Sequence, residues 1–332
     1  MRPQILTWAT LATVLALAAC DSEKDTSDTE PDVDTDTDTD TEPEAVWEQE
    51  RAETSESLQG VYASGQGVFA VSTGGRLWTY RAASGWSDED GGTEGEDLND
   101  IWGVGSGDTM EAWAVGDAGN LIHFIDEGYN NYDVGTGNFE AVGGPSTNWL
   151  FFAGYGGVYF YDGDAWTYET VPAGARINDV WATVDIAFAV GEDGLLLRRV
   201  SAAKGWEMMT SPTDLPLFAV GGATAADLWA VGQDGIVLRL TGSDWVEFDA
   251  DPDPKSPGVQ RFTGQSLWDV WGIQNDAVYA VGNNGTAFVW DTETWTELPT
   301  GVDNNLYAVH GSTAYDVWAA GNRGMAIHYV VE

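Results

Sequence analysis

Carboxylates are the side chains of this sequence whose number and spacing could do chemistry. The chain has 54 Asp and Glu residues against 13 Lys and Arg. Two carboxyl groups about 5–10 Å apart suffice for glycoside hydrolysis, one as the acid and one as the nucleophile or base. Asp100, Asp179 and Asp269 share one local pattern, in which Ile or Val and then Trp follow the acid. Two acid-rich stretches, 88–97 and 249–257, supply further candidates.

We predict that the two acid-rich stretches are connections between structural repeats and form a binding rim for a cation or a basic partner. The candidate rim residues are Asp88, Glu89, Asp90, Glu94, Asp249, Asp251 and Asp253. Asp100, Asp179 and Asp269 are expected instead to hold backbone N–H groups at strand ends. We therefore predict no catalytic residue. The alternative is a carbohydrate-active enzyme, a glycosidase or lyase, that uses the rim carboxylates.

Other reactive residues are few. The chain has three histidines and one cysteine, and it lacks the zinc, phosphate-loop and nucleophile-elbow motifs. His123 and His328 occupy equivalent repeat positions, and His310 takes a position held elsewhere by Trp, so we assign them structural roles. We predict no metal site and no cofactor. Calcium is the alternative, although the Thr-Asp alternation of residues 32–40 lacks the glycine and bidentate acid of a calcium loop.

The N-terminal segment predicts export. Arg2 precedes an apolar run over residues 5–19, too short for a membrane-spanning helix but typical of a signal peptide. The run ends in Leu17-Ala18-Ala19-Cys20. This ending resembles the bacterial lipobox, in which the cysteine is acylated after cleavage. We therefore predict a signal peptide over residues 1–19 and lipidation, including palmitate, at Cys20.

Residues 20–44 are predicted to be a disordered acidic linker. Residues 21–44 hold twelve acids and one lysine, with no aromatic residue, so this segment cannot bury enough apolar surface to fold. The formal net charge of −41 argues against nucleic acid and against anionic lipid as partners. We expect a monomer, tethered by its lipid to the outer membrane or cell surface in preference to the inner membrane.

A motif repeats seven times after the linker: an aromatic residue, two small or apolar residues, Gly, two turn residues and Gly, with two looser copies. The seven aromatic residues are Phe69, Trp113, Phe151, Phe188, Trp229, Tyr279 and Trp318. The final glycines are 44, 38, 37, 41, 50 and 39 residues apart, a spacing typical of propeller blades made of four short strands. We assign the Trp members of this column, Trp113, Trp229 and Trp318, to core packing.

The order of strands predicts how the ring closes. A fourth-strand aromatic follows each of the first six motifs: Trp86, Tyr129, Trp166, Trp206, Trp245 and Trp295. The seventh copy has none, whereas Trp47 stands before the first copy without a blade of its own. We predict an all-β fold over residues 45–332: a seven-bladed propeller of four-stranded antiparallel blades, with the N-terminal strand completing the last blade.

The segments Asp100–Gly103 and Trp113–Gly119 resemble repeats of the neuraminidase-repeat, photosystem-assembly-factor-like and WD-repeat-like propellers. The sialidase Asp-box and a regular WD-repeat pairing are missing, and propellers host unrelated activities. The resemblance, which covers residues 45–332, implies the architecture. With the signal peptide, it favours a membrane-anchored envelope binding or assembly scaffold that presents a propeller face to a protein or glycan partner.

Overall fold

The computed structural model contains seven four-stranded antiparallel sheets, and each sheet contains one copy of the sequence repeat. The structure describes residues 45–93, 95–105, 110–125, 128–135, 137–174, 176–249, 261 and 263–331. The signal peptide, Cys20 and the acidic linker lie outside these residues. None of the helices in the described part of the chain is long and apolar enough to span a membrane.

The first four blades follow the chain in order. Blade 1 consists of β2 (Leu58–Ala63), β3 (Val68–Ser72), β4 (Arg76–Arg81) and β5 (Gly85–Asp90). Blade 2 consists of β6 (Leu98–Val104), β7 (Glu111–Gly116), β8 (Leu121–Ile125) and β9 (Gly128–Asn131). Blade 3 consists of β10 (Phe139–Ser146), β11 (Trp149–Gly154), β12 (Gly157–Tyr161) and β13 (Trp166–Glu169). Blade 4 consists of β14 (Ile177–Ala182), β15 (Ala187–Gly191), β16 (Leu196–Ser201) and β17 (Gly205–Met208).

The remaining three blades include the one that joins the two ends of the domain. Blade 5 consists of β18 (Leu217–Thr224), β19 (Asp227–Gly232), β20 (Val237–Thr241) and β21 (Asp244–Glu247). Blade 6 consists of β22 (Leu267–Gln274), β23 (Ala277–Gly282), β24 (Ala287–Trp290) and β25 (Trp295–Glu297). Blade 7 consists of β26 (Leu306–Thr313), β27 (Asp316–Gly321), β28 (Ala326–Val331) and, on its outer edge, β1 (Ala45–Gln49).

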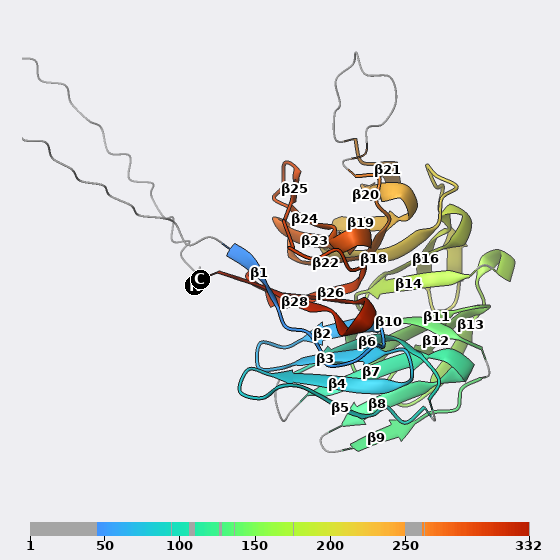
Figure 1. Ribbon diagram of the computed structural model, residues 1–332. Coiled ribbons are helices and arrows are strands. Elements are labelled where there is room, and N and C mark those ends of the chain that lie inside the picture. Colours follow the sequence, from blue (N-terminus) through green and yellow to red (C-terminus); the bar gives the residue numbers. More distant parts are fainter. Residues whose placement is uncertain are drawn as a thin grey trace, which may run out of the picture. The chain divides into compact units, whose positions relative to one another are not determined.

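The N-terminal strand completes blade 7, as the position of Trp47 predicts. Figure 1 shows β1, in blue, beside β28, in red, and the two strands pair from Ala45 with Val331 to Gln49 with Ile327. The Trp47 ring lies 5.1 Å from that of Tyr329. The innermost strands contact one another in sequence from β2 to β26, and β26 contacts β2 in turn. The blades therefore form a closed ring around a central channel.

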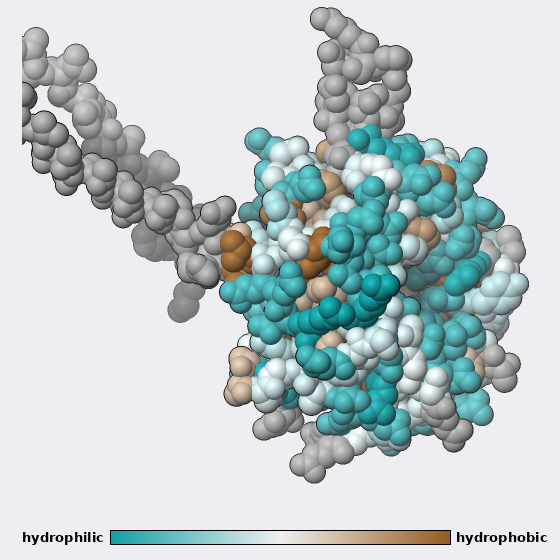
Figure 2. Space-filling view, viewed as in Figure 1, coloured by the Kyte–Doolittle hydropathy of each residue, from teal (hydrophilic) through white to brown (hydrophobic). Residues whose placement is uncertain are grey.

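Apolar clusters between neighbouring blades form the core. Trp113, Trp229 and Trp318 are at most 3% exposed and belong to three of these clusters, which confirms the packing role predicted for them. The surface differs in character: Figure 2 shows hydrophilic residues over most of one face, with hydrophobic residues in small separate patches.

The turn after the second strand is tighter than the sequence suggests. In blades 2, 4, 5, 6 and 7 it forms a short 3₁₀ helix, and the residue before its final glycine is also left-handed, with φ between 54° and 57°. These helices are η2 (Asp117–Gly119), η4 (Glu192–Gly194), η5 (Gln233–Gly235), η6 (Asn283–Gly285) and η7 (Asn322–Gly324); η3 (Pro172–Gly174) lies between blades 3 and 4.

Both glycines of the motif have a steric reason. A Cβ atom on Gly232, the first glycine, would lie 2.1 Å from the carbonyl oxygen of Pro216. On Gly235, the last, it would lie 2.1 Å from the carbonyl oxygen of Thr263, and φ there is 72°. Side chains at these positions would push the inner strand and the following loop away from the turn.

Candidate functional site

Each inner strand carries a β-bulge near its first residue. In β6, Leu98 pairs with Gly116 and Asp100 pairs with Val115, so Asn99 is the extra residue. The same register shift occurs at the equivalent position of all seven inner strands. A bulge bends the strand and re-aims the extra side chain. Here the extra side chain of every blade lines the mouth of the channel.

Seven bulge residues thus form a ring, which we call the mouth ring: Gln59, Asn99, Glu140, Asn178, Phe218, Trp268 and Tyr307. The ring has two unlike halves. Blades 1 to 4 contribute amide or carboxyl groups, and blades 5 to 7 contribute aromatic rings, which we call the aromatic arc. The rings of Phe218 and Trp268 are stacked with centroids 4.4 Å apart, and Trp268 meets Tyr307 edge-on at 5.8 Å.

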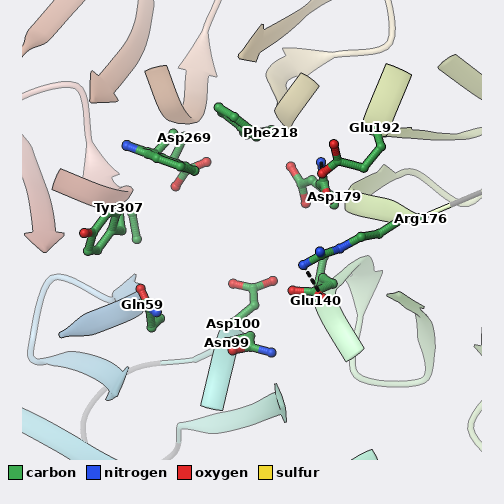
Figure 3. A pocket seen from close by; sticks show the side chains of 15 residues that line it. Gln59, Asn99, Asp100, Glu140, Arg176, Asp179, Glu192, Phe218, Asp269 and Tyr307 are labelled. Carbon is green, nitrogen blue, oxygen red and sulfur yellow. Dashed lines mark hydrogen bonds and ion pairs between the residues drawn. The ribbon is translucent and has the colours of Figure 1, made fainter. Parts of the chain in front are cut away.

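Three carboxylates lie next to the mouth ring, one residue further along the inner strands of blades 2, 4 and 6. Figure 3 shows Asp100, Asp179 and Asp269 around one central space, inside a cavity of about 410 Å³. Blades 1, 3, 5 and 7 have Gly or Ala at this position. The three acids, which share one position of the sequence repeat, therefore also lie together in space.

Each of these three carboxylates holds two backbone N–H groups. One oxygen of Asp100 accepts a hydrogen bond from Ile101 (2.8 Å), and the other accepts one from Val142 in the next blade (2.8 Å). Asp179 accepts from Val180 at 2.6 Å and Val220 at 2.7 Å, and Asp269 accepts from Val270 and Val309, both at 2.7 Å. The predicted structural role is confirmed, and it joins blades 2 to 3, 4 to 5 and 6 to 7.

The pKa values of all three carboxyl groups lie above the ordinary aspartate range. Burial raises the pKa of Asp100 to about 7, against the opposing hydrogen bond from Val142, and the charge of Asp269 adds to the rise. Burial likewise raises the pKa of Asp269 to about 6. The pKa of Asp179 is raised by burial and then by the charges of Asp100 and Asp269. Burial thus opposes ionisation of all three carboxyl groups, and repulsion between neighbouring carboxylates adds to this effect at Asp100 and Asp179.

Most polar residues of the mouth ring form hydrogen bonds with a neighbouring blade. Arg176 donates a hydrogen bond to Glu140 at 2.8 Å, drawn as a dashed line in Figure 3. The amide of Asn99 donates to the carbonyl oxygen of Phe139, and that of Asn178 donates to the carbonyl oxygen of Leu217, both at 2.9 Å. These bonds orient the polar residues without covering the aromatic arc.

The prediction that residues 88–90 lie in a connection between blades is wrong. Asp88, Glu89 and Asp90 belong to the outermost strand β5, where they are exposed, and none of them lines the channel cavity. Asp88 forms an ion pair with Arg76 of the adjacent strand β4. A strand tolerates this acidic run because its backbone pairs with β4 on one side while its side chains face solvent.

Of the other predicted site residues, the structure describes only Asp249, which does not line the channel cavity. Asp249 follows β21 and is half-buried. Glu94, Asp251, Asp253 and Cys20 lie outside the described residues. The sequence offered one signal for the mouth ring: the second residue of each inner strand varies from blade to blade, whereas the first and fourth residues are always apolar. The sequence repeat does not indicate the β-bulge, so the sequence alone could not show that this variable residue faces the channel.

The histidines are held by the fold, as their repeat positions predict. The His123 ring stacks on Trp113 at 3.9 Å and its Nε2 lies 2.7 Å from Glu111; His328 stacks on Trp318 at 4.1 Å and lies 2.6 Å from Asp316. His310 accepts a hydrogen bond from the N–H of Ala63, and burial lowers its pKa to about 4. Among the described residues, no group of three or more His, Cys, Asp or Glu could hold a metal ion.

Comparison with known proteins identifies the fold alone. No family model matches the chain, and no curated protein matches it in sequence. Among solved structures, YCF48 bound to a D1 peptide is similar with a TM-score of 0.68 and 15% identity, over 86% of this chain and 95% of that one. YCF48 from Cyanidioschyzon merolae is similar with a TM-score of 0.67 and 17% identity, over 86% and 99%.

Other solved propellers match this chain with similar TM-scores. A catalytically inactive virginiamycin B lyase from Staphylococcus aureus, solved with quinupristin, matches with a TM-score of 0.72 and 12% identity, over 87% of this chain and 100% of that one. The RRP9 WD40 repeats match with a TM-score of 0.71 and 9% identity, over 88% and 99%. At such identities only the architecture is shared. The chain is thus a seven-bladed β-propeller whose structural neighbours include both YCF48 and WD40 proteins.

Proposed function

We propose that this protein is an exported, lipid-anchored scaffold that binds a protein partner through the mouth ring. One observation carries the proposal: every blade uses a bulge to aim a side chain at the channel mouth, and these side chains vary more than the apolar residues one place before and two places after them. Bulges are concentrated next to functional sites, where they re-aim side chains.

The chemistry of the mouth favours binding over catalysis. The three channel carboxylates are committed to backbone N–H groups of two blades each, so moving any of them would loosen the ring. The aromatic arc offers three partly exposed aromatic rings, a kind of residue that often anchors protein interfaces. YCF48, which shares the architecture, has been solved with a D1 peptide, and this supports a polypeptide as the partner.

The anchor is the second half of the proposal. The lipobox-like ending at Cys20 and the acidic segment 21–44 support a lipid-anchored protein held away from the membrane surface. We place it at the outer membrane or cell surface, where the propeller would bind or help to assemble an envelope protein.

A capture experiment tests this function. Full-length protein is immobilised and exposed to envelope extract at low and at moderate salt, beside the double variant Phe218→Gln/Tyr307→Gln. Gln59 occupies the same bulge in blade 1, so glutamine is compatible with this backbone position. Tyr155→Gln serves as control, because Tyr155 is 72% exposed and does not line the mouth.

We expect one partner that is retained at moderate salt by the wild type and the control and lost by the double variant. Recovery of only salt-sensitive basic proteins, equally by all three, would show that net charge alone was acting and would refute the role of the mouth ring.

A second function is favoured by one specific observation. Asp100 has a pKa of about 7 and shares its channel with two further carboxyl groups, as an acid catalyst of glycoside cleavage would require. In this candidate function the protein is a glycosidase or lyase that works from the channel. Cleavage of envelope polysaccharides, followed by the release of reducing or unsaturated ends and abolished in Asp100→Asn, would establish it.

A further inference from the structure

The mouth ring combines an aromatic wall with an excess of negative charge. Of the described residues that line it, five are acidic: Asp100, Glu140, Asp179, Glu192 and Asp269. Arg176 is the one basic residue among them, and it is already paired with Glu140. A ligand that enters beside the aromatic arc therefore meets Asp269 of the same blades and the other four acids from blades 2 to 4. This sign of charge disfavours an anionic ligand.

Aromatic faces attract cations. The negative face of Trp, Tyr or Phe stabilises a guanidinium or ammonium group within about 6 Å of the ring centre, more strongly where water is excluded. The arc presents three such rings in consecutive blades, and the rings of Phe218 and Trp268 are stacked on each other. A planar guanidinium suits this site best, because it can stack on a ring while its N–H groups bind carboxylates.

Among the described residues, two of the protein's own arginines have this combination of partners. The guanidinium carbon of Arg239 lies 4.8 Å from the ring centre of Trp229, and its Nη2 lies 3.0 Å from Asp227. Arg199 lies 4.8 Å from the ring centre of Phe160 and binds both carboxylate oxygens of Glu169. In each case an aromatic ring supports one face of the cation and a carboxylate accepts its hydrogen bonds.

We infer that the mouth ring receives an arginine side chain of the protein partner, with its guanidinium against the aromatic arc and its N–H groups directed at the channel carboxylates. This inference rests on the proposed binding function and names the chemistry of the group that is bound. A cavity of about 410 Å³ lies within the range of roughly 300–1,000 Å³ that is typical of ligand sites, so a side chain with part of its backbone can enter.

The state of the channel carboxylates supports the inference. Burial raises the pKa of Asp100, Asp179 and Asp269, and neighbouring aspartate charges add to the rise at Asp100 and Asp179. Glu140, Glu192 and Arg176 are the other charged groups that line the cavity. A cation among them stabilises their ionised forms, so its binding releases protons. Arginine should therefore bind more tightly at pH 8 than at pH 5.5.

Short capped peptides test the inference directly. The full-length protein is titrated by calorimetry with acetyl-Gly-Ser-Arg-Ser-Gly-amide and with the same peptide carrying lysine or citrulline, which keeps the shape of arginine but is neutral. We expect the citrulline peptide to bind about tenfold more weakly or not at all. Phe218→Gln/Tyr307→Gln should weaken binding of the arginine peptide by a similar factor, and Tyr155→Gln should leave it unchanged.

The possible failures are distinguishable. If citrulline and arginine peptides bind alike, or if the peptides fail to bind while capture of an envelope protein still depends on Phe218 and Tyr307, the inference about arginine is overturned and the proposed function stands. If the double variant changes neither peptide binding nor capture, both are overturned. Preference for the lysine peptide over the arginine peptide would also overturn the assignment of a guanidinium.

Discussion

Glu169 of blade 3 binds Arg199 of blade 4 through both carboxylate oxygens. The Nε atom of Arg199 lies 2.9 Å and 3.1 Å from the two oxygens, and Nη2 lies 2.7 Å from one of them. Trp206, also in blade 4, donates its indole N–H to the same carboxylate at 2.9 Å. Both side chains of the ion pair are almost fully buried, at 6% and 10% exposure. One acid therefore satisfies two donors across a blade interface.

The first prediction is that Glu169→Gln destabilises the propeller by about 3–5 kcal/mol, because it leaves a buried guanidinium without its counter-charge. Urea unfolding followed by tryptophan fluorescence measures the change. Glu207→Gln is the matched control: its partner Arg198 is on the same strand as Arg199, but the pair is half-exposed and should be worth less than about 1 kcal/mol. Equal losses in the two variants would refute the special role of Glu169.

The second prediction concerns the pH dependence of stability. The folded-state pKa of Asp100 is about 7, above its unfolded value near 4, so the folded protein holds a proton there that the unfolded chain releases. Stability from this group is therefore greatest below about pH 4 and is lost as the pH rises to 7. In Asp100→Asn this loss disappears.

The measurement is the free energy of unfolding of wild type and Asp100→Asn at pH 4.5, 6 and 7.5. The free energy of unfolding of the wild type should fall relative to that of Asp100→Asn as the pH rises. Asp244→Asn, at an exposed position in β21, provides the comparison. A constant difference across the range would show that Asp100 titrates alike in the folded and unfolded chain.

Much of the fold could be predicted from the sequence because the repeat is regular. The aromatic and glycine positions placed the second strand and its turn in each blade, and the unpaired Trp47 identified the strand that closes the ring. These features follow from local sterics and packing, which act on residues close in sequence. Trp86 to Trp295 likewise fall in outer strands, and Tyr129 takes the equivalent position in β9.

The site was far less predictable. The mouth ring depends on a one-residue bulge, which changes where a side chain points without changing the repeat. The acids at 88–90 were wrongly placed in a connection, because acidic residues are poor strand formers and the pairing of β5 with β4 overrides that preference. The aromatic arc depends on the spatial order of blades 5 to 7 and on the bulges that aim side chains at the channel mouth. No single repeat shows either feature.

The third prediction exchanges equivalent residues between blades. His328 stacks on Trp318 and bonds to Asp316, just as Arg239 lies over Trp229 and bonds to Asp227. His328→Arg should therefore change stability by about 1 kcal/mol or less, whereas His328→Leu should cost about 1–3 kcal/mol.

The hydrogen bond from His328 also holds the pKa of Asp316 below its usual range, so its contribution is lost as the pH falls through that lowered value. Thermal unfolding of the three proteins at pH 7 and pH 3.5 distinguishes these effects. A destabilised arginine variant would mean that the two blades are not interchangeable here.

The fourth prediction tests ring closure. Deletion of residues 45–49 removes β1 and leaves the edge of β28 unpaired, with the loss of the contact between Trp47 and Tyr329. We expect Tm to fall by about 6–12 °C, for a loss of roughly 3 kcal/mol, and the protein to aggregate through the open edge. Deletion of residues 25–40 is the control, since the acidic linker is predicted to make no folded contact. Equal Tm values for the two deletions would contradict closure by β1.

The fifth prediction addresses the anchor. If Cys20 is acylated, cells fed an alkyne analogue of palmitate should label the wild-type protein and should release it from membranes only with detergent, because the acyl chains bury many methylene groups in the bilayer. Cys20→Ser should lose the label and the membrane association together, while the propeller keeps its unfolding transition, since residues 45–331 form the sheets without it. Persistent label in the variant would exclude the only cysteine as the site of acylation. An unlabelled wild type found free of membranes would exclude the anchor itself, and the mouth ring would then have to meet its partner in solution.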